Sequence, residues 1–138
     1  MDTYTGRHLF SAAELDQFIE KNALRSIRVG FSDLLGVQRG KLIPVSNAKA
    51  LLDPAGKGLM CSSAVMALGY DDEFVDASFL PDKRDDFGIA ADLSTLELLP
   101  YAQRTAFVQG DLIYGGKPFA AGPRSFLKDV VDRYHALG

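Results

Sequence analysis

The spacing of apolar residues changes from helical to alternating about 25 residues into the chain. Before the change, Ser11 and Glu14 have the form of a capping box, and the apolar residues after them recur every three or four positions, which predicts a helix over residues 11–22. After the change, every second residue is apolar over residues 27–31, which is typical of a half-buried strand. A turn and a returning strand over residues 37–44 follow, so the sequence predicts a hairpin.

Weaker signals predict the rest of the fold. The expected elements are a short helix capped by Ser46 that ends near Pro54, strands over residues 63–70, 94–99 and 105–114, and a helix that begins at Pro123. Strands that follow one another with short helices between them, without regular βαβ alternation, predict an α+β fold with a mixed or antiparallel sheet. The helices at residues 11–22 and 46–53 are expected to cover one face of that sheet.

Composition narrows the class of protein. With 138 residues, 47% of them hydrophobic and 24% charged, the chain suits one globular core and excludes collagen-like and wholly disordered proteins. A single cysteine, Cys61, cannot form an internal disulfide, which favours a reducing, cytoplasmic location. The net charge of −3 is the wrong sign for a general nucleic-acid binder, and no apolar run approaches the ~20 residues that span a bilayer. Residues 1–10 show no signal-peptide core and are predicted to be a disordered tail.

Two local motifs look like ligand sites and are interpreted otherwise. Residues 110–117 resemble a phosphate-binding loop, but five residues rather than four precede the Gly-Lys pair and Pro118 follows it, so a hairpin turn is expected. Residues 71–92 hold eight of the 18 acidic residues against two basic ones. Such a segment either binds a divalent cation or forms a solvated loop, and the acids miss the spacing of an EF-hand, which favours the loop. Spacing alone therefore predicts no metal site and no complete catalytic set.

Three segments, in this order along the chain, resemble segments of the glutamine synthetase superfamily. The sequence FSDLLGVQRGKLIP at residues 31–44 resembles its first hairpin. DLSTLELLPY at residues 92–101 resembles its PDxSTxxxxP segment, and GKPFAAGPRSFLK at residues 116–128 resembles the lead into its linker helix. The resemblance covers nearly the whole chain. It implies a β-grasp N-terminal domain over residues 11–122 and a linker helix over residues 123–138, leading into a C-terminal catalytic domain that lies outside this chain.

The resemblance also implies an activity for a full-length enzyme. In that family, ATP phosphorylates the γ-carboxylate of glutamate to γ-glutamyl phosphate, and an amine then displaces the phosphate. Mg or Mn ions and ATP are bound by the C-terminal domain, so no cofactor is expected on this chain, which should be inactive alone. The subunits form a homo-oligomeric ring, in which the N-terminal domain completes the active site of a neighbouring subunit.

The same resemblance assigns candidate site residues. The FDGSS loop of the family falls on residues 59–63, where Ser62 and Ser63 match and Met60 replaces the aspartate of the ammonium site. A second acid of the amine pocket corresponds to Asp86, for which a solvated loop acid is the alternative. Because a thioether cannot balance an ammonium charge, we expect an amine larger than ammonia, as in γ-glutamylpolyamine synthetase-like members that join glutamate to polyamines. An ordinary glutamine synthetase that uses ammonia is one alternative, and a free-standing β-grasp binding module without catalysis is another.

Three further features are expected near an interface. Arg39 and Lys41 project from the same side of the returning strand, and they either meet a subunit or active-site boundary or form a solvated face. Arg124 is predicted to tie the two domains together. An apolar stripe on the last helix, from Phe126 to Leu137, is expected to be covered by the rest of the enzyme and to leave the isolated chain prone to self-association.

Overall fold

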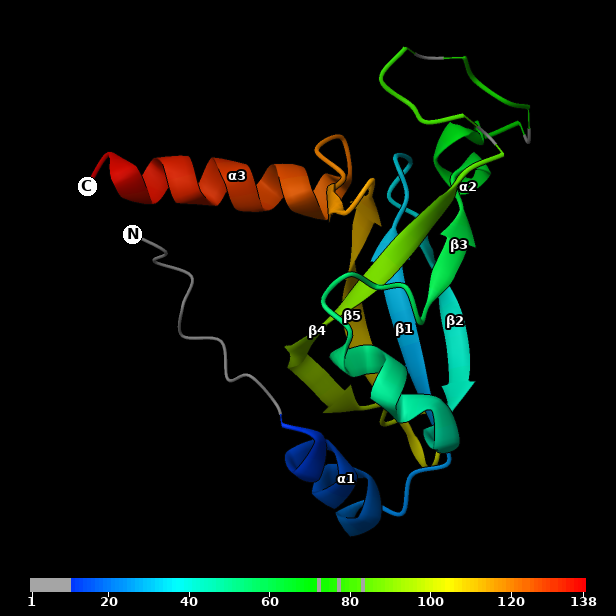
Figure 1. Ribbon diagram of the computed structural model, residues 1–138, viewed down its shortest axis with the longest axis vertical. Coiled ribbons are helices and arrows are strands. Elements are labelled where there is room, and N and C mark those ends of the chain that lie inside the picture. The colour runs from blue at the N-terminus through cyan, green and yellow to red at the C-terminus, as the bar shows by residue number, and fades with distance from the viewer. Residues whose placement is uncertain (1–10, 72, 77, 83) are drawn as a thin grey trace.

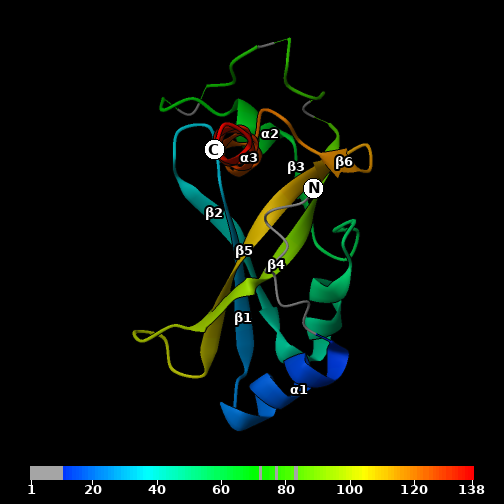
Figure 2. The same ribbon diagram turned by 90° about the vertical axis from the view of Figure 1, so that its left-hand side faces the viewer.

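A strongly twisted, mixed β-sheet with short helices on it forms the body of the protein (Figures 1 and 2). The computed structural model describes residues 11–71, 73–76, 78–82 and 84–138. In chain order the elements are α1 (Ala12–Lys21), β1 (Ser26–Ser32), β2 (Gln38–Pro44), the 3₁₀ helix η1 (Val45–Leu52), β3 (Met60–Ser62), α2 (Ala64–Ala67), β4 (Asp86–Leu98), β5 (Thr105–Tyr114), β6 (Lys117–Pro118) and α3 (Pro123–Ala136). The predicted disordered tail over residues 1–10 lies outside the described residues.

The strands follow the order β2-β1-β5-β4-β3, and β6 pairs with β5. β1 runs parallel to β5, whereas the pairs β1–β2, β4–β5 and β3–β4 are antiparallel. Two antiparallel units joined through a central parallel pair make a β-grasp sheet, so the predicted α+β fold is confirmed. The predicted hairpin at the start of the chain is β1–β2, in which Ser26 pairs with Pro44 and Ser32 with Gln38.

Asp33 organises the turn of this hairpin. Its Oδ1 accepts the backbone N–H groups of Leu35 and Val37 at 2.9 and 2.8 Å, and its Oδ2 accepts the Nε–H of Arg39 at 2.8 Å. The Asp33 side chain is only 2% exposed, so these bonds replace the water that the carboxylate loses on burial. Arg39, expected at an interface or on a solvated face beside Lys41, therefore stabilises the turn.

The helices α1 and η1 lie together on one face of the sheet and cover the core, as predicted (Figure 2). The capping box of α1 is formed, because the N–H of Glu14 donates to Ser11 Oγ at 3.2 Å and the N–H of Ser11 donates to Glu14 Oε2 at 2.8 Å. Leu15 of α1 and Leu51 of η1 are buried against the sheet. The buried apolar residues of the sheet are Ile27, Val29, Phe31, Ile43, Phe87, Ile89, Ala106, Val108 and Leu112. Full burial of one large apolar side chain stabilises a fold by about 1.5–3 kcal/mol.

The second helix, η1, begins without the predicted cap. Pro44 precedes η1, and Ser46 lies inside it instead of capping it. The N–H of Val45 donates to the carbonyl of Arg25 at 3.1 Å. This bond to the residue before β1 satisfies the first N–H of η1, so the end of β2 sets where the helix begins.

Residues 63–70 do not form the predicted strand. β3 ends at Ser62, whose Oγ accepts the N–H of Ala64 at 3.2 Å, and the chain then turns into the single helical turn α2. Met66 and Ala67 are buried by this turn. A short apolar run fits a buried helical turn as well as a strand, so the spacing of apolar residues did not separate the two.

β4 begins at Asp86, well before the strand predicted at residues 94–99. Its first half pairs with β3 and β5, and Phe87 and Ile89 alternate into the core with no exposed surface. The acidic residues around them obscured this alternation in the sequence. Asp86 is therefore an exposed strand residue rather than a loop residue.

The structure of the C-terminal part of the chain agrees with the prediction from the sequence. Gly115 and Gly116 adopt φ values of +57° and +78° in the turn between β5 and β6, which confirms the expected hairpin turn. α3 carries Pro123 in its first turn, extends away from the sheet (Figure 1) and has no buried residue. On its apolar stripe, Phe126 and Tyr134 are 63% and 77% exposed. No helix in the described ranges is both long and apolar enough to cross a membrane.

Candidate functional site

The register of β3 and β4 brings together two of the three candidate site residues, Ser62 and Asp86. Ser62 lies directly opposite Asp86, and Met60 lies opposite Gly88. Because directly opposed residues share one side of an antiparallel pair, the side chains of Met60, Ser62 and Asp86 lie on the same side of the ladder. All three are exposed, and we call them the β3–β4 face. This face combines a carboxylate, a hydroxyl and a thioether.

Ser63, the third assigned residue, points into the protein. It is 2% exposed, its Oγ–H donates to the carbonyl of Asp82 at 2.5 Å, and its N–H donates to the carbonyl of Asp85 at 2.9 Å. Both acceptors belong to the segment that leads into β4. Ser63 therefore ties this segment to the end of β3 and does not face a substrate.

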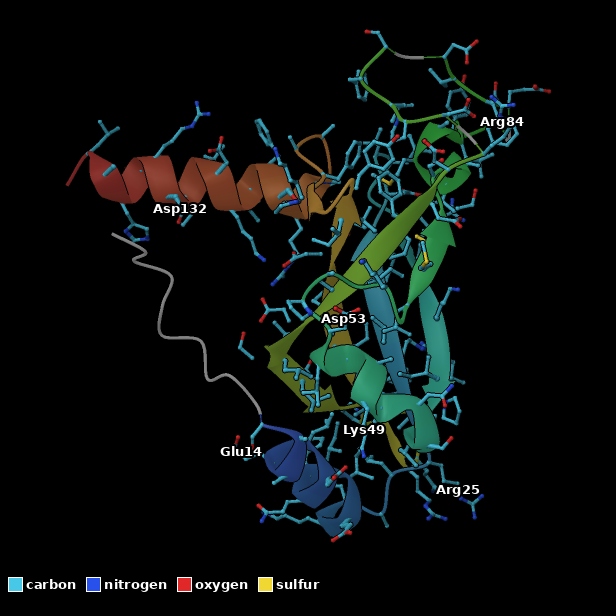
Figure 3. All side chains as sticks on the ribbon, viewed as in Figure 1. Glu14, Arg25, Lys49, Asp53, Arg84 and Asp132 are labelled. Atoms are coloured by element: carbon cyan, nitrogen blue, oxygen red, sulfur yellow. The ribbon has the colours of Figure 1, made fainter. Side chains whose placement is uncertain are left out.

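A tyrosine of β5 holds the same segment from the other side. The Tyr114 hydroxyl donates to Asp85 Oδ2 at 2.6 Å, and this hydrogen bond raises the pKa of Tyr114. Arg84 donates to Asp82, with an Nη2–Oδ2 distance of 2.6 Å, and this hydrogen bond with the carboxylate raises the pKa of Arg84. Figure 3 shows Arg84 beside α2, at the end of the sheet opposite Glu14 and Arg25. Asp86 thus follows a segment that is bound by Ser63, directly after β3, and by Tyr114 of β5.

A groove of about 480 Å³ opens at the base of the loop between α2 and β4. Its lining residues, which we call the loop groove, are Ala67, Val75, Asp76, Ser78, Leu80, Pro81 and Asp82. Asp82 of this groove contacts the residue that follows β3, because its carbonyl accepts the Ser63 hydroxyl. Ser63 is buried, whereas Ser62 is exposed on the β3–β4 face, so this hydrogen bond connects the groove to a buried residue and not to that face.

The charge of this part of the molecule is negative. Residues 71–92 hold eight acids and two bases, whereas the rest of the chain holds 10 acids and 13 bases. Such a field attracts cations. Within the described ranges, however, no three His, Cys, Asp or Glu side chains lie close enough to hold a metal ion, and Asp72 lies outside those ranges. The divalent-cation interpretation of this segment therefore has no ligand set among the residues described.

Cys61 lies beside the site but is a poor nucleophile. It pairs with Phe87 across the ladder, on the side that faces the core. Burial raises the pKa of the Cys61 thiol from 9.0 to about 11, with a smaller lowering by Lys41 and a smaller increase by Asp86. The thiol is thus neutral at neutral pH, as expected for an inert, partly buried cysteine.

A second cavity, of about 600 Å³, lies where α3 meets β4 and β5. Next to the sheet its lining includes Asp92 and Asp111. The Arg124 guanidinium donates to both carboxylates, and the Lys128 ammonium donates to Asp111 and lies 3.9 Å from Asp92. Two cations face two carboxylates, so these charges balance. Arg124 binds α3 to the sheet within this chain, and its predicted role between domains stays a prediction.

Sequence reasoning missed the residues that support the site. Asp85 and Tyr114 are 29 positions apart, and Ser63 and Asp82 are 19 apart. Neither pair has a characteristic spacing, because the contacts depend on how β3, β4 and β5 assemble. The one available signal was the Ser-Ser pair at the end of β3, which is typical of a turn as well as of a substrate loop.

No family model matches the chain. Among curated proteins, it is 32% identical over 127 residues to a glutamate–isopropylamine ligase of Pseudomonas sp., a match that covers 88% of this chain and 27% of that protein. It is 27% identical over 123 residues to a γ-glutamylanilide synthase of Acinetobacter sp., covering 82% of this chain and 25% of that protein. A glutamate–methylamine ligase of Methyloversatilis universalis is 28% identical over 129 residues, covering 93% and 26%. The chain thus spans about a quarter of the length of the curated relatives it matches.

Solved structures that superpose on this chain include proteins of the same kind. A complex of GmaS with ADP superposes with a TM-score of 0.67 at 27% identity, over 88% of this chain and 25% of that chain. A glutamine synthase homologue superposes with a TM-score of 0.66 at 26% identity, over 83% of this chain and 28% of that chain. The homologues of this chain are therefore glutamate–amine ligases of the glutamine synthetase family, matched over part of their length.

Proposed function

We propose that this chain, a homologue of glutamate–amine ligases, is the N-terminal domain of an ATP-dependent enzyme that joins glutamate to an amine larger than ammonia. The relatives support the ligase class, because each is named for a product or reaction that joins glutamate to an organic amine. The named amines are isopropylamine and methylamine, and the third name is that of an anilide. We therefore favour a monoamine with a small alkyl or aryl group, and polyamine use stays a prediction.

The observation that carries this proposal is the pairing of Ser62 with Asp86 beside Met60. An alkylamine is protonated at neutral pH and must lose a proton before its nitrogen can attack. A carboxylate favours the ammonium form in the ground state and then accepts its proton. In our proposal Asp86 does both, Ser62 offers a hydrogen bond to the nitrogen, and Met60 contacts the organic substituent.

The rest of the reaction belongs to the larger part of the enzyme. ATP transfers its γ-phosphoryl group to the γ-carboxylate of glutamate, and the amine nitrogen then attacks that carbon, so that phosphate leaves and an amide forms. We propose that Mg or Mn and ATP bind outside this chain. We also propose that the β3–β4 face closes the pocket of a neighbouring subunit in a homo-oligomeric ring, which separates it from the phosphate-handling groups until the ring assembles.

The test uses the full-length protein encoded by the reading frame that contains this chain. Phosphate release is measured with ATP, glutamate and Mg, and with ammonia, methylamine or isopropylamine in turn. We expect amine-dependent release, with the highest kcat/KM for an organic amine. Asp86→Asn is expected to lower kcat/KM for the amine about 10²- to 10⁴-fold, the usual range for a lost general base.

Asp16→Asn is the matched control, because Asp16 is an exposed aspartate on α1, at the other end of the sheet. It is expected to leave kcat/KM unchanged. Highest efficiency with ammonia would restore the ordinary glutamine synthetase alternative. A reading frame that stops directly after residue 138 would instead support the free-standing binding module.

A further inference from the structure

We infer that Tyr114 of β5 is a positioning residue for Asp86 and fixes the direction of this carboxylate on the β3–β4 face. The inference rests on the proposed function, because it concerns the group that we propose as the base of the amine reaction. Tyr114 is not one of the residues of that face. It acts through the two residues that flank Asp86 in the chain, one held by its hydroxyl and the other by its ring.

The hydroxyl of Tyr114 binds the residue before Asp86. It donates to Asp85 Oδ2 at 2.6 Å, and a hydrogen bond to a carboxylate is roughly twice as strong as one between neutral groups. The same contact raises the pKa of Tyr114, so the hydroxyl keeps the proton that it donates. The carbonyl of Asp85 also accepts the N–H of Ser63 at 2.9 Å. Asp85 is therefore held from β5 through its side chain and from the end of β3 through its backbone.

The ring of Tyr114 contacts the residue after Asp86. The centroids of Tyr114 and Phe87 lie 5.8 Å apart with the ring planes at 68°, an edge-to-face arrangement that aromatic pairs prefer. Phe87 has no exposed surface, and its centroid lies 4.7 Å from that of Phe119, which is buried too. Phe87 is thus fixed in the core with Tyr114 at its edge.

These two contacts determine where the Asp86 side chain points. Asp85 and Phe87 both contact Tyr114, so their side chains lie on the same side of the chain. Successive side chains of an extended segment alternate between its two sides, and Asp86 therefore points away from Tyr114. On that other side it lies opposite Ser62 in the β3–β4 register. Because both neighbours of Asp86 are held, its backbone cannot turn the carboxylate away from the face without breaking a contact.

The proposed reaction requires such support. Asp86 is the first residue of β4 and is exposed, a position at which a side chain has few neighbours of its own. A general base must lie within about 2.6–3.2 Å of the proton donor that it serves, and a misplacement of about 1 Å can lower a rate about 100-fold. Tyr114 limits this misplacement without occupying the face on which the amine would bind.

Other contacts of the segment act further from Asp86. The Ser63 hydroxyl and the Arg84 guanidinium both bind Asp82, which precedes Asp86 by four residues. They hold the segment as a whole, whereas Tyr114 contacts the two residues directly bonded to Asp86. Loss of the Tyr114 hydroxyl is therefore expected to affect the carboxylate itself.

The test measures kcat/KM for methylamine in the full-length enzyme with ATP, glutamate and Mg. Tyr114→Phe removes the hydroxyl and keeps the ring against Phe87. We expect it to lower kcat/KM for the amine at least tenfold, and to leave the KM for ATP within about twofold. Tyr101→Phe is the matched control, because it removes the same hydroxyl from a side chain that is 76% exposed in the turn between β4 and β5. It is expected to leave both constants within about twofold.

A double variant separates positioning from a general loss of structure. If Tyr114 acts through Asp86, Tyr114→Phe has no further effect on an enzyme that already carries Asp86→Asn. Losses that multiply in the double variant would overturn the inference. Asp85 supplies a second check, since Asp85→Ala removes the acceptor and should match Tyr114→Phe. Asp85→Asn keeps an oxygen for the hydroxyl and should retain most of the activity, and equal losses in both Asp85 variants would contradict the inference.

The same measurements distinguish this inference from the proposed function. If Asp86→Asn lowers kcat/KM for the amine but Tyr114→Phe lowers it no more than Tyr101→Phe does, the positioning role is wrong and the proposed function stands. If Asp86→Asn has no effect, or if no amine stimulates phosphate release, the proposed function fails and the inference fails with it.

Discussion

Arg124 donates its Nε–H to Asp111 at 2.8 Å and so attaches the first turn of α3 to β5. A second N–H of the same guanidinium binds Asp92 on β4. The Asp92 side chain is 4% exposed and that of Arg124 is 29% exposed. One arginine therefore balances a buried carboxylate and binds a helix that has no buried residue to the sheet. Together with Lys128, which also donates to Asp111, this contact attaches α3 to the sheet.

Replacement of Arg124 is therefore expected to be costly. Arg124→Leu leaves Asp92 buried without its main partner, and we expect it to lower the free energy of unfolding by about 2–4 kcal/mol in urea titrations. Arg124→Lys keeps the charge but cannot donate to both carboxylates with the geometry of a guanidinium, so an intermediate loss of unfolding free energy is expected. Arg133→Leu is the control, because Arg133 forms an exposed pair with Asp129, 77% and 53% exposed, and should change stability by less than about 0.5 kcal/mol. Equal losses for both leucine variants would contradict this account of α3.

The apolar stripe of α3 predicts self-association of the isolated chain. Leu127 and Tyr134 are 61% and 77% exposed on one helix, and a contiguous exposed apolar surface favours contact with another copy. We expect the apparent mass in light scattering to rise with protein concentration, and Leu127→Lys to abolish the rise. His135→Lys adds the same charge outside the stripe and should not. A monomer at every concentration would show that the stripe does not mediate self-association.

The turn between β1 and β2 is expected to depend on Asp33. Asp33→Ala removes the acceptor of three hydrogen bonds from a buried position, and we expect a loss of about 2–4 kcal/mol in unfolding free energy. Asp33→Asn keeps an oxygen for Leu35 and Val37 but loses the charge that binds Arg39, so about half that loss is expected. Asp53 provides the comparison, because it accepts two backbone N–H groups in the same way but is only half-buried. Asp53→Ala should cost about 1 kcal/mol.

The elements that sequence analysis located correctly have local signals. The β1–β2 hairpin combines alternation with a turn, α1 has its capping box, and α3 begins with Pro123. The start of β4 has no such signal, because Phe87 and Ile89 are core residues only when β3 and β5 flank them. The same limit applies to the site. Resemblance identified Ser62 and Asp86, but only the assembled sheet shows that they face each other.

The partly buried thiol of Cys61 makes a kinetic prediction. With a pKa of about 11 rather than 9.0, the reactive thiolate at pH 8 is about 100-fold less populated than in the unfolded chain. Alkylation by iodoacetamide should be slower in the native protein by about this factor, and urea should remove the difference. Native alkylation at the unfolded rate would show that the thiol is not shielded.

The same pKa shift makes stability depend on pH. Between pH 9 and 11 the folded chain holds the Cys61 proton that the unfolded chain has lost. The free energy of unfolding is therefore unaffected by Cys61 below pH 9 and falls as the pH rises from 9 to 11. Urea midpoints measured across this range should fall with pH, and less steeply in Cys61→Ala. Identical slopes in the two proteins would mean that titratable groups other than Cys61 cause the fall in the urea midpoint.

The identity of residue 60 is expected to govern the choice between ammonia and organic amines. Met60 lies opposite Gly88 and diagonal to Asp86, and it is 42% exposed, so a carboxylate introduced there stays solvated. Met60→Asp would place two carboxylates about 7–8 Å apart on the β3–β4 face, close enough for both to act on a small ammonium ion. The ratio of kcat/KM for ammonia to that for isopropylamine should then rise at least tenfold in the full-length enzyme. Met60→Asn is the control, because asparagine has nearly the shape of aspartate without its charge, and it should leave the ratio within about threefold. A similar rise in both variants would mean that the loss of the methionine side chain, and not the added charge, allows ammonia to be used.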